Sequence, residues 1–330
     1  MSDLRKDPTR GQWVLVRPPG TAPAPNPECP FCPGNERFTP REIASYRKDG
    51  SSADGPGWSV RVVPEADPYF RIELPLDREG VGLYDKITPR GASELVIESP
   101  RHDDAPGTMP VPQWEQVLWM YGERIRDLKR DLAIRDLLVT RRHRIPGSRI
   151  THPYSRITAI PIIFDEVRGK LDQAREYYQY KRRCIYCDIV RQELADAERV
   201  VHETERFIVV VPYAGRAPFE LWILPRQHAS AYEDALSGDL VADLAKLVSG
   251  CFGTLAASLS DPSVEMTLFT APNRGAKVLA GEWATLADDY HWHIGIIPRP
   301  ERLKRMGGIY VTDTPPETAA SRLRDAWALG

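Results

Sequence analysis

The pattern of apolar and polar residues runs through the same order twice along the chain. In each half, short apolar stretches are followed by one long segment with apolar residues at helical spacing, and then by further apolar stretches. The long segments are 111–133 and 236–259. The short stretches before them are 58–64, 94–99, 206–213 and 219–225, and those after them are 136–143, 150–161, 264–273 and 290–300. This order predicts an α+β protein with two tandem units, each with a mostly antiparallel sheet and a crossing helix.

The domain boundaries follow from the repeat. We expect an N-terminal half at 1–165 and a C-terminal half at 184–330. Between them, residues 166–183 are polar and rich in Arg and Lys, which predicts a connecting helix.

Composition limits the class of protein. The 330 residues are 42% hydrophobic and 27% charged, values typical of a soluble globular protein. No apolar run approaches the roughly 18 residues of a membrane span, and the start MSDLRKDPTRGQWVLV lacks the pattern of a secretion signal. A formal net charge of −2 argues against broad binding to nucleic acid or to a membrane. We therefore expect a cytoplasmic protein that recognises phosphate only locally, if at all.

Cysteine and histidine residues also occur in repeated order. Each half has a Cys-x-x-Cys pair, then a histidine after an apolar stretch, then a histidine beyond the long helix. The two sets are Cys29, Cys32, His102 and His152, and Cys184, Cys187, His228 and His291. Thiolate with imidazole favours Zn²⁺, and four protein ligands indicate a structural site, so we expect two zinc ions per chain. The alternative is that these side chains are simply buried. The fifth cysteine, Cys251, is expected in the core.

Taken together, these motifs resemble the galactose-1-phosphate uridylyltransferase family of the histidine-triad superfamily. The matching phrases are LRKDPTRGQWVLV, CPFCPGNE, TPREI, WSVRVVP, VIESPRH, HPYSR, FELWILPRQH, YHWHIGIIPR and PPETAASRLRDA, which extend over nearly the whole chain. The resemblance implies two histidine-triad-like units and a homodimer. It also implies transfer of a nucleotidyl group from a nucleoside-diphosphate sugar to a sugar phosphate through a nucleophilic histidine.

The chain departs from the family at that nucleophile. In HPYSR, Tyr154 stands where the family has the second histidine of His-Pro-His, and Arg156 stands where it has a glutamine. Three more family positions are changed, to Arg141, His143 and Arg149. These three residues and Ser155 are candidate substrate-binding residues. The arginines are included because one guanidinium group can donate two parallel hydrogen bonds to a phosphate group.

The second half keeps a histidine, His293, at the position equivalent to Tyr154. Asn273, Gly275 and Lys277 precede it as possible phosphate contacts, and Gly295 stands where the family commonly has a glutamate. Within a strand, His291 and His293 point to the same face. Because the family does not use this histidine as its nucleophile, a structural role for His293 competes with a catalytic one.

Three hypotheses remain open from the sequence. The first is a nucleotidyltransferase in which Tyr154, a direct displacement or His293 replaces the usual route, with Tyr154, Arg156 and His293 as candidate catalytic residues. The second is a catalytically inactive protein that binds a nucleotide or phosphate. The third is a lyase or hydrolase of a phosphorylated metabolite, in which Tyr154 is a general acid.

Overall fold

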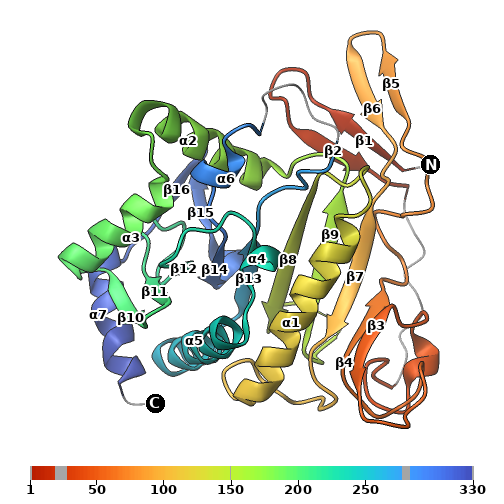
Figure 1. Cartoon of the computed structure of the whole chain (residues 1–330), viewed down its shortest axis with the longest axis horizontal. Helices are drawn as coiled ribbons and strands as arrows, with labels where there is room; N and C mark the ends of the chain where they lie inside the picture. The colour runs from red at the N-terminus through yellow and green to blue at the C-terminus, as the bar shows by residue number, and fades with distance from the viewer. Residues whose placement is uncertain (1, 19–27, 149, 277–282, 329–330) are drawn as a thin grey trace.

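The centre of the molecule is one antiparallel sheet of ten strands. A computed structural model describes residues 2–18, 28–148, 150–276 and 283–328 (Figure 1). The strand order in the sheet is β10-β11-β12-β14-β13-β8-β9-β7-β4-β3. The strands of the first unit are β3 (Ala44–Arg47), β4 (Trp58–Pro64), β7 (Ala92–Ile97), β8 (Asp136–His143) and β9 (Tyr154–Ile160). Those of the second unit are β10 (Val200–Glu203), β11 (Phe207–Val210), β12 (Leu221–Pro225), β13 (Val264–Phe269) and β14 (His293–Pro298).

The duplication seen in the sequence is present in the strand order. Outward from the middle, the first unit runs β8, β9, β7, β4, β3, and the second runs β13, β14, β12, β11, β10. The predicted α+β class with two tandem, antiparallel units is therefore confirmed. The sequence did not predict that β8 and β13 would pair with each other, with Thr140 opposite Thr267. This pairing hides one edge of each unit, since an unpaired strand edge leaves backbone N–H and C=O groups without partners. The domain boundaries stay a prediction.

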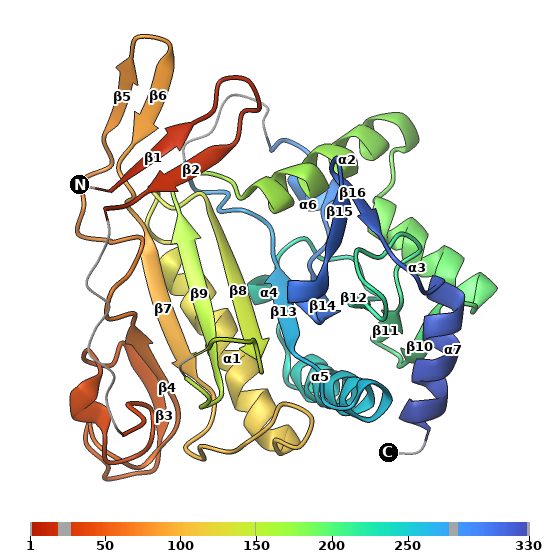
Figure 2. The same ribbon diagram turned by 180° about the vertical axis from the view of Figure 1, so that it is seen from behind.

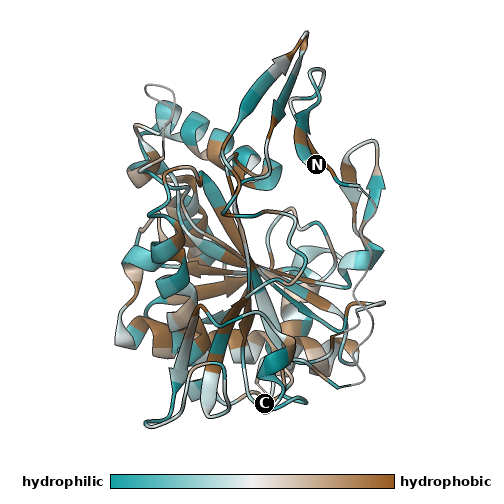
Figure 3. Cartoon of the chain, turned by 90° about the vertical axis from the view of Figure 1, so that its right-hand side faces the viewer, coloured by the Kyte–Doolittle hydropathy of each residue, from teal (hydrophilic) through white to brown (hydrophobic). Residues whose placement is uncertain are grey.

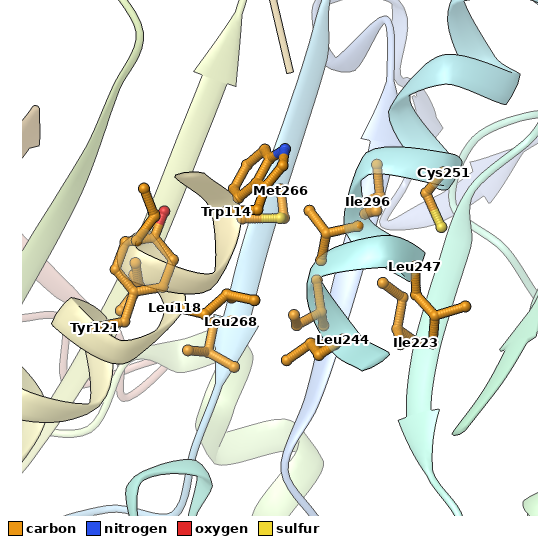
Figure 4. Packing of buried hydrophobic residues seen from close by; sticks show 14 of the residues in the cluster. Trp114, Leu118, Tyr121, Ile223, Leu244, Leu247, Cys251, Met266, Leu268 and Ile296 are labelled. Carbon is orange, nitrogen blue, oxygen red and sulfur yellow. The ribbon is translucent and has the colours of Figure 1, made fainter. Parts of the chain in front are cut away.

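Two long helices, α1 (Val111–Leu128) and α5 (Gly238–Leu259), cross one face of the sheet and form the main core with it (Figure 4). Apolar residues of α1 recur every three or four positions, so one stripe of the helix faces the strands. In α5 the hydroxyl of Ser237 caps the first turn by accepting a hydrogen bond from the backbone N–H of Leu240. Cys251 is fully buried in this core, as expected.

Helix α5 is long and apolar enough to cross a membrane. Half of its most apolar window is buried inside the protein, and its buried residues pack in the main core. The prediction that no apolar run approaches such a length was therefore too strict, although the packing accounts for the helix. The cellular location stays a prediction.

The opposite face of the sheet is covered unevenly. Over the second unit lie α2 (Asp165–Lys181) and α3 (Ile185–Asp196), whose apolar residues pack against β11 and β12. Helix α2 occupies nearly the segment expected to connect the halves. Figure 2 shows β7, β9 and β8 of the first unit from this side, with no described helix in front of them. The first unit is thus the more open of the two.

Smaller elements surround the central sheet. A four-stranded sheet of order β2-β1-β6-β5 projects beside the first unit, and the hairpin β15–β16 lies near α2 and α3 (Figure 1). Hydropathy colouring shows apolar strands in the interior and polar helix surfaces outside (Figure 3). The remaining elements are β1 (Asp3–Lys6), β2 (Trp13–Val16), η1 (Glu36–Phe38), β5 (Arg78–Val81), β6 (Tyr84–Ile87), α4 (Tyr232–Ala235), α6 (Leu286–Asp289), η2 (Pro300–Arg302), β15 (Lys304–Met306), β16 (Ile309–Val311) and α7 (Pro316–Trp327).

Candidate functional site

The four cysteine and histidine residues of the first set lie together. Cys32 Sγ is 3.4 Å from His102 Nδ1 and 3.8 Å from His152 Nδ1, and Cys29 Sγ is also 3.8 Å from His152 Nδ1. A tight turn holds the two cysteines, since the backbone N–H of Cys32 donates to the carbonyl of Cys29. The side-chain amide of Asn35 donates to the same carbonyl at 2.9 Å. The sequence fixes this turn locally, while the histidines come from distant segments.

The second set is gathered in the same way but on a different backbone. Cys187 Sγ lies 3.3 Å from His228 Nδ1 and 3.7 Å from His291 Nδ1, and Cys184 Sγ lies 4.0 Å from His291 Nδ1. Cys184 is the residue before α3 and Cys187 is in its first turn. The start of helix α3 thus holds the cysteine pair of the second set, whereas a tight turn holds that of the first set.

Each cluster can hold a metal ion, because all four ligand atoms of each set lie within 4.8 Å of one another. Bond lengths of 2.0–2.3 Å place the ligands of a tetrahedral metal about 3.3 to 3.8 Å apart, which most of the measured separations match. In both sets Nδ1 faces the centre. The Nε2 atoms of His152 and His228 are directed outward to the carbonyls of Ser99 and Ala287, each at 2.8 Å. Such outer hydrogen bonds fix the tautomer of a metal-bound histidine.

The protonation states of His152 and Cys187 suit ligation, whereas burial raises the pKa of Cys32 to about 11 and a hydrogen bond with Cys187 raises the pKa of Cys184. Burial lowers the pKa of His152 to about 4, so the ring is neutral at pH 7. A hydrogen bond from Cys184, with others from His228 and His291, lowers the pKa of Cys187 to about 3. Neutral imidazole and thiolate are the forms that bind metals.

Beside the first cluster, Tyr154 and Arg156 lie on the open face of β9. Tyr154 is half-buried against Phe31, with ring centres 5.6 Å apart, and its hydroxyl has no hydrogen-bond partner among the described residues. Arg156 Nη2 donates to Glu65 Oε1 at 2.6 Å. The buried atoms Arg156 Nε and Glu65 Oε2 lack partners within the described part of the chain. Unpaired buried polar atoms of this kind are rare, so water or a ligand at this point would complete their hydrogen bonds.

Arg156 belongs to one row of cross-strand neighbours, which we call the central row. It comprises Leu95, Arg156, Thr140, Thr267, Gly295 and Trp222. The row passes from one unit into the other through the Thr140–Thr267 pair, so the two ends correspond: Leu95 to Trp222 and Arg156 to Gly295. The arginine of the first unit therefore has no cationic counterpart in the second.

Ser155 and Arg141 lie on the other face, between the sheet and α1. Both residues contact Glu98: Arg141 Nε donates to Glu98 Oε2 at 2.8 Å, and the Ser155 hydroxyl donates to Glu98 Oε1. The Tyr121 hydroxyl also contacts both, at 3.1 Å from Glu98 Oε1 and 2.5 Å from Ser155 Oγ. Arg141 is only 2% exposed and its guanidinium lies over the rings of Trp114 and Phe252. This arrangement separates Arg141 and Ser155 from the open face that carries Tyr154.

His293 is enclosed in the second unit. Its Nδ1–H donates to the carbonyl of His291 at 3.0 Å, and its Nε2 accepts a hydrogen bond from the Lys170 ammonium of α2 at 2.9 Å. The Lys170 ammonium also lies over the rings of Trp222 and Phe269. Burial, with the charge of Lys170, lowers the pKa of His293 well below its usual value. Both ring nitrogens of His293 are thus engaged within the protein.

The remaining candidates lie apart from Tyr154. His143, at the end of β8, contacts Asp261, and burial lowers its pKa. The Asn273 side-chain amide donates to the carbonyls of Lys129, Asp131 and Ile134, which ties the end of α1 to the loop after β13. The side-chain oxygen of Asn273 accepts from the backbone N–H of Gly275. Arg149 and Lys277 lie outside the described residues.

Sequence reasoning missed three residues of these sites, Glu98, Glu65 and Lys170. Glu98 ends the apolar run ELVIE, and a carboxylate among buried positions signals a buried partner. Lys170 lies between Val167 and Ala174, the buried residues of α2, so its helical spacing places it on the buried stripe. Glu65 follows a buried strand and carries no comparable signal.

Comparison with known proteins identifies relatives along the whole chain. Residues 170–252 match the family model described as galactose-1-phosphate uridyl transferase, C-terminal domain. The chain is 26% identical to ADP-glucose phosphorylase of Arabidopsis thaliana, over 98% of this chain and 92% of that protein. It is 25% identical to galactose-1-phosphate uridylyltransferase of Thermotoga maritima, over 98% of both chains.

Solved structures agree with these matches. A uridylyltransferase mutant superposes with a TM-score of 0.81 at 28% identity and covers 99% of this chain and 98% of its own. An Arabidopsis thaliana ADP-glucose phosphorylase with bound ADP-glucose has a TM-score of 0.75 at 26% identity, over 98% of this chain and 99% of that one. The repeated units, the two Cys/His clusters and these full-length matches lead to one conclusion. The chain is similar to galactose-1-phosphate uridylyltransferases and to ADP-glucose phosphorylase along nearly its whole length.

Proposed function

We propose that this protein is a nucleotidyltransferase that acts on a nucleoside-diphosphate sugar and a phosphate acceptor at the open face of the first unit. The observation that carries the proposal is the difference between Tyr154 and His293. Tyr154 is half-buried and its hydroxyl has no hydrogen-bond partner in the described part of the chain, while both ring nitrogens of the fully buried His293 are engaged. A nucleophile has to reach the substrate, which favours the first unit.

The reaction would proceed in two transfers. The Tyr154 oxygen attacks the phosphorus that carries the nucleoside, the bond from that phosphorus to the bridging oxygen breaks, and sugar 1-phosphate leaves. The phenol proton passes to solvent or to the departing phosphate. An oxygen of the acceptor phosphate then attacks the same phosphorus and releases tyrosine, which regains a proton. Because a phenol is mostly protonated at pH 7, this route needs cationic neighbours that favour the phenolate.

Arg156 is the cationic group nearest in sequence on the same face. Its unpaired Nε and the unpaired Glu65 Oε2 support a polar ligand beside the central row. Thr140 and Thr267 are half-buried neighbours in that row and add hydroxyl groups. We assign Arg156 to the phosphate oxygens of the transition state.

The metal of both clusters is proposed to be Zn²⁺. Two thiolates and two imidazoles at these separations fit a closed tetrahedral zinc site, and such a site supplies structural stability rather than a reacting group. In the first unit Cys29, Cys32, His102 and His152 would hold the metal, and the short peptide from His152 to Tyr154 would then be anchored at one end.

The protein is proposed to act as a homodimer. Two hairpins carry exposed apolar side chains, Val81, Leu83 and Tyr84 around β5–β6, and Met306, Ile309 and Val311 on β15–β16. Exposed apolar side chains on projecting hairpins favour an interface with a second copy of the chain, which would cover them. Analytical sedimentation measures the oligomeric state directly. We expect a dimer for the wild-type protein and a monomer for Leu83→Glu.

The test of the main proposal is a search for a covalent nucleotidyl adduct. The protein is incubated separately with UDP-glucose and ADP-glucose, because the relatives include a uridylyltransferase and an ADP-glucose phosphorylase. Intact and peptide mass spectrometry then locates any adduct, and sugar phosphates and inorganic phosphate are offered as acceptors. We expect a nucleotide on the Tyr154 peptide that is absent in Tyr154→Phe and released by an acceptor.

Other outcomes distinguish the alternatives. Turnover without an adduct supports direct displacement, and an adduct on the His293 peptide rejects the first-unit assignment. Binding without turnover or adduct supports the second candidate, a non-catalytic nucleotide-binding protein. That candidate is favoured because Tyr154 stands where the resemblance implies a nucleophilic histidine, while both sets of metal-ligating residues are kept. Hydrolysis or elimination of a phosphorylated metabolite would favour the lyase or hydrolase.

A further inference from the structure

The first unit contains a group of buried polar side chains at a place where the corresponding described residues of the second unit are apolar. Glu98, Arg141, Ser155 and Tyr121 are at most 2% exposed and contact one another between the sheet and α1 (Figure 4 labels Tyr121). We call these four residues the Glu98 cluster. None of them faces the site of the proposed transfer, because the neighbouring residues Tyr154 and Ser155 point to opposite faces of β9.

The second unit provides an internal comparison. Ser155 follows Tyr154 and pairs with Arg141 across the β8–β9 ladder. The corresponding residues are Ile294, which follows His293, and its ladder partner Leu268. The same position in the fold is therefore built from apolar side chains in the second unit. Because apolar residues serve there, the core does not require an ion pair at this place.

Glu98 connects the buried ion pair to the first metal cluster. Its backbone N–H donates to the carbonyl of Pro153, between His152 and Tyr154, at 3.1 Å. Its neighbour Ser99 accepts the hydrogen bond from His152 Nε2 at 2.8 Å. The amide of Gln113 holds the Glu98 carbonyl at 2.7 Å. The side chain, the N–H and the carbonyl of Glu98 are thus all fixed.

From this geometry we infer that the Glu98 cluster positions the His152–Tyr154 peptide of the first unit. Arg141, Tyr121 and Ser155 hold the Glu98 side chain, and the 98–99 backbone then sets the orientation of His152 and the direction in which Tyr154 leaves the peptide. Glu98 and Arg141 are positioning residues, since neither faces the proposed substrate. The inference rests on the proposed metal at the first cluster.

The test compares two ion pairs of the same layer. The variant Glu98→Leu/Arg141→Met replaces the cluster's charges with apolar groups like those of the second unit. The matched control is Glu94→Leu/Arg124→Met, since Arg124 and Glu94 form another buried pair between α1 and the sheet, with two contacts of 2.8 Å. That control pair makes no contact with residues 152–154.

The readout is the protection of the cysteines by metal. Zinc-loaded protein is incubated with EDTA and N-ethylmaleimide, and peptide mass spectrometry follows alkylation of Cys29 and Cys32 against Cys184 and Cys187. We expect about tenfold faster alkylation of the first pair in the Glu98/Arg141 variant, the lower end of the effect of losing outer partners of metal-bound histidines. The second pair, and both pairs in the control variant, should keep the wild-type rate.

Equal rates for the first pair in the variant and in wild type would overturn the inference, as would an equal increase in the control. If the double variant does not fold, Tyr121→Phe removes one hydroxyl from Glu98, and it should raise the rate at Cys29 and Cys32 alone. No such rise would also overturn the inference. Wild-type protein with fewer than two zinc ions per chain would instead contradict the proposed metal, so the two failures are distinguishable.

Discussion

The two units share one strand order but differ on both faces of the sheet. On the helix side, the first unit has Arg141 and Ser155 in contact with Glu98, where the second unit has Leu268 and Ile294 in place of Arg141 and Ser155. On the other side, the first unit leaves Tyr154 and Arg156 partly exposed, while Lys170 of α2 covers His293 in the second. The Cys/His clusters are present in both. Duplication thus preserved the scaffold and its ligand sets, and changed what surrounds them.

This difference suggests that the second unit serves the stability of the fold and that the first unit serves the binding of a substrate. In the second unit, helix α2 covers this face and places the Lys170 ammonium beside His293, whereas no described helix lies over the same face of the first unit (Figure 2). Near Lys170, Arg216 pairs with Glu166 and Glu220, so the charges there compensate one another. No described helix would have to move for a substrate to reach Tyr154 in the first unit. We therefore expect changes in the second unit to affect folding and changes in the first to affect function, with the Glu98 cluster as the exception.

The largest expected effect concerns the metal clusters. Cys184→Ser should lower the free energy of unfolding by more than about 4 kcal/mol, because the variant lacks a ligand of the proposed structural metal, and loss of such a metal is among the most damaging single changes. Cys29→Ser should cost less, since Cys184 is buried beside the residues of α2 and α3, whereas Cys29 lies in a half-buried turn. Urea unfolding with metal analysis measures both. Equal losses would contradict the greater structural role assigned to the second cluster.

The second-largest loss of stability is expected from a single substitution in the buried Glu98–Arg141 pair. Arg141→Leu leaves the Glu98 carboxylate buried without its cation, which should cost about 3 to 5 kcal/mol. The double variant Glu98→Leu/Arg141→Met should unfold near the wild-type urea concentration, because no unpaired charge remains. If the single and double variants are equally destabilised, the loss comes from packing and not from an unpaired charge.

The third prediction is a pH dependence in the second unit. Burial lowers the pKa of Lys170 from 10.5 to about 8, so the folded protein disfavours the charged amine. The unfolded chain then binds more protons between pH 8 and 10.5, and stability contributed by this residue rises with pH across that window. The penalty is fully present below pH 8 and amounts to about 3 kcal/mol.

Lys170→Met removes this titration. The difference in unfolding free energy between the variant and wild type should therefore shift in favour of wild type as the pH is raised from 8 towards 10. Comparing two proteins at each pH cancels the other titrating groups, including Glu166, Arg216 and Glu220. A difference that does not change with pH would show that Lys170 titrates normally.

Local sequence patterns predicted the scaffold well. The helical stripe of α1, the alternating strands and the repeated Cys-x-x-Cys pairs each depend on neighbouring residues, so the α+β class and the two units followed from them. The eight cysteine and histidine residues also lie together as two sets. The joining of β8 to β13 depends on contacts between strands 120 or more residues apart, for which no local pattern exists.

The direction of side chains was harder to predict than their position. Arg141 and Arg156 were expected to act together, but they lie on opposite faces because Arg141 pairs in the ladder with Ser155, one residue before Arg156. Likewise, Asn273 had a suitable residue type for a phosphate contact, yet three backbone carbonyls accept its amide. Which face or partner a polar residue takes depends on register, and register is set by the assembled sheet.

The smallest expected change in stability is at the proposed nucleophile. Tyr154→Phe should alter the free energy of unfolding by less than about 0.5 kcal/mol, because the hydroxyl has no hydrogen-bond partner among the described residues and the ring can keep its contact with Phe31. Its counterpart His293→Phe should cost about 1 to 3 kcal/mol, since the buried Lys170 ammonium loses its acceptor. Activity should show the reverse order: nucleotidyl transfer is lost in Tyr154→Phe and kept in folded His293→Phe. Transfer that survives in Tyr154→Phe would remove the phenol from the reaction, and a large loss of stability there would mean that the hydroxyl supports the fold.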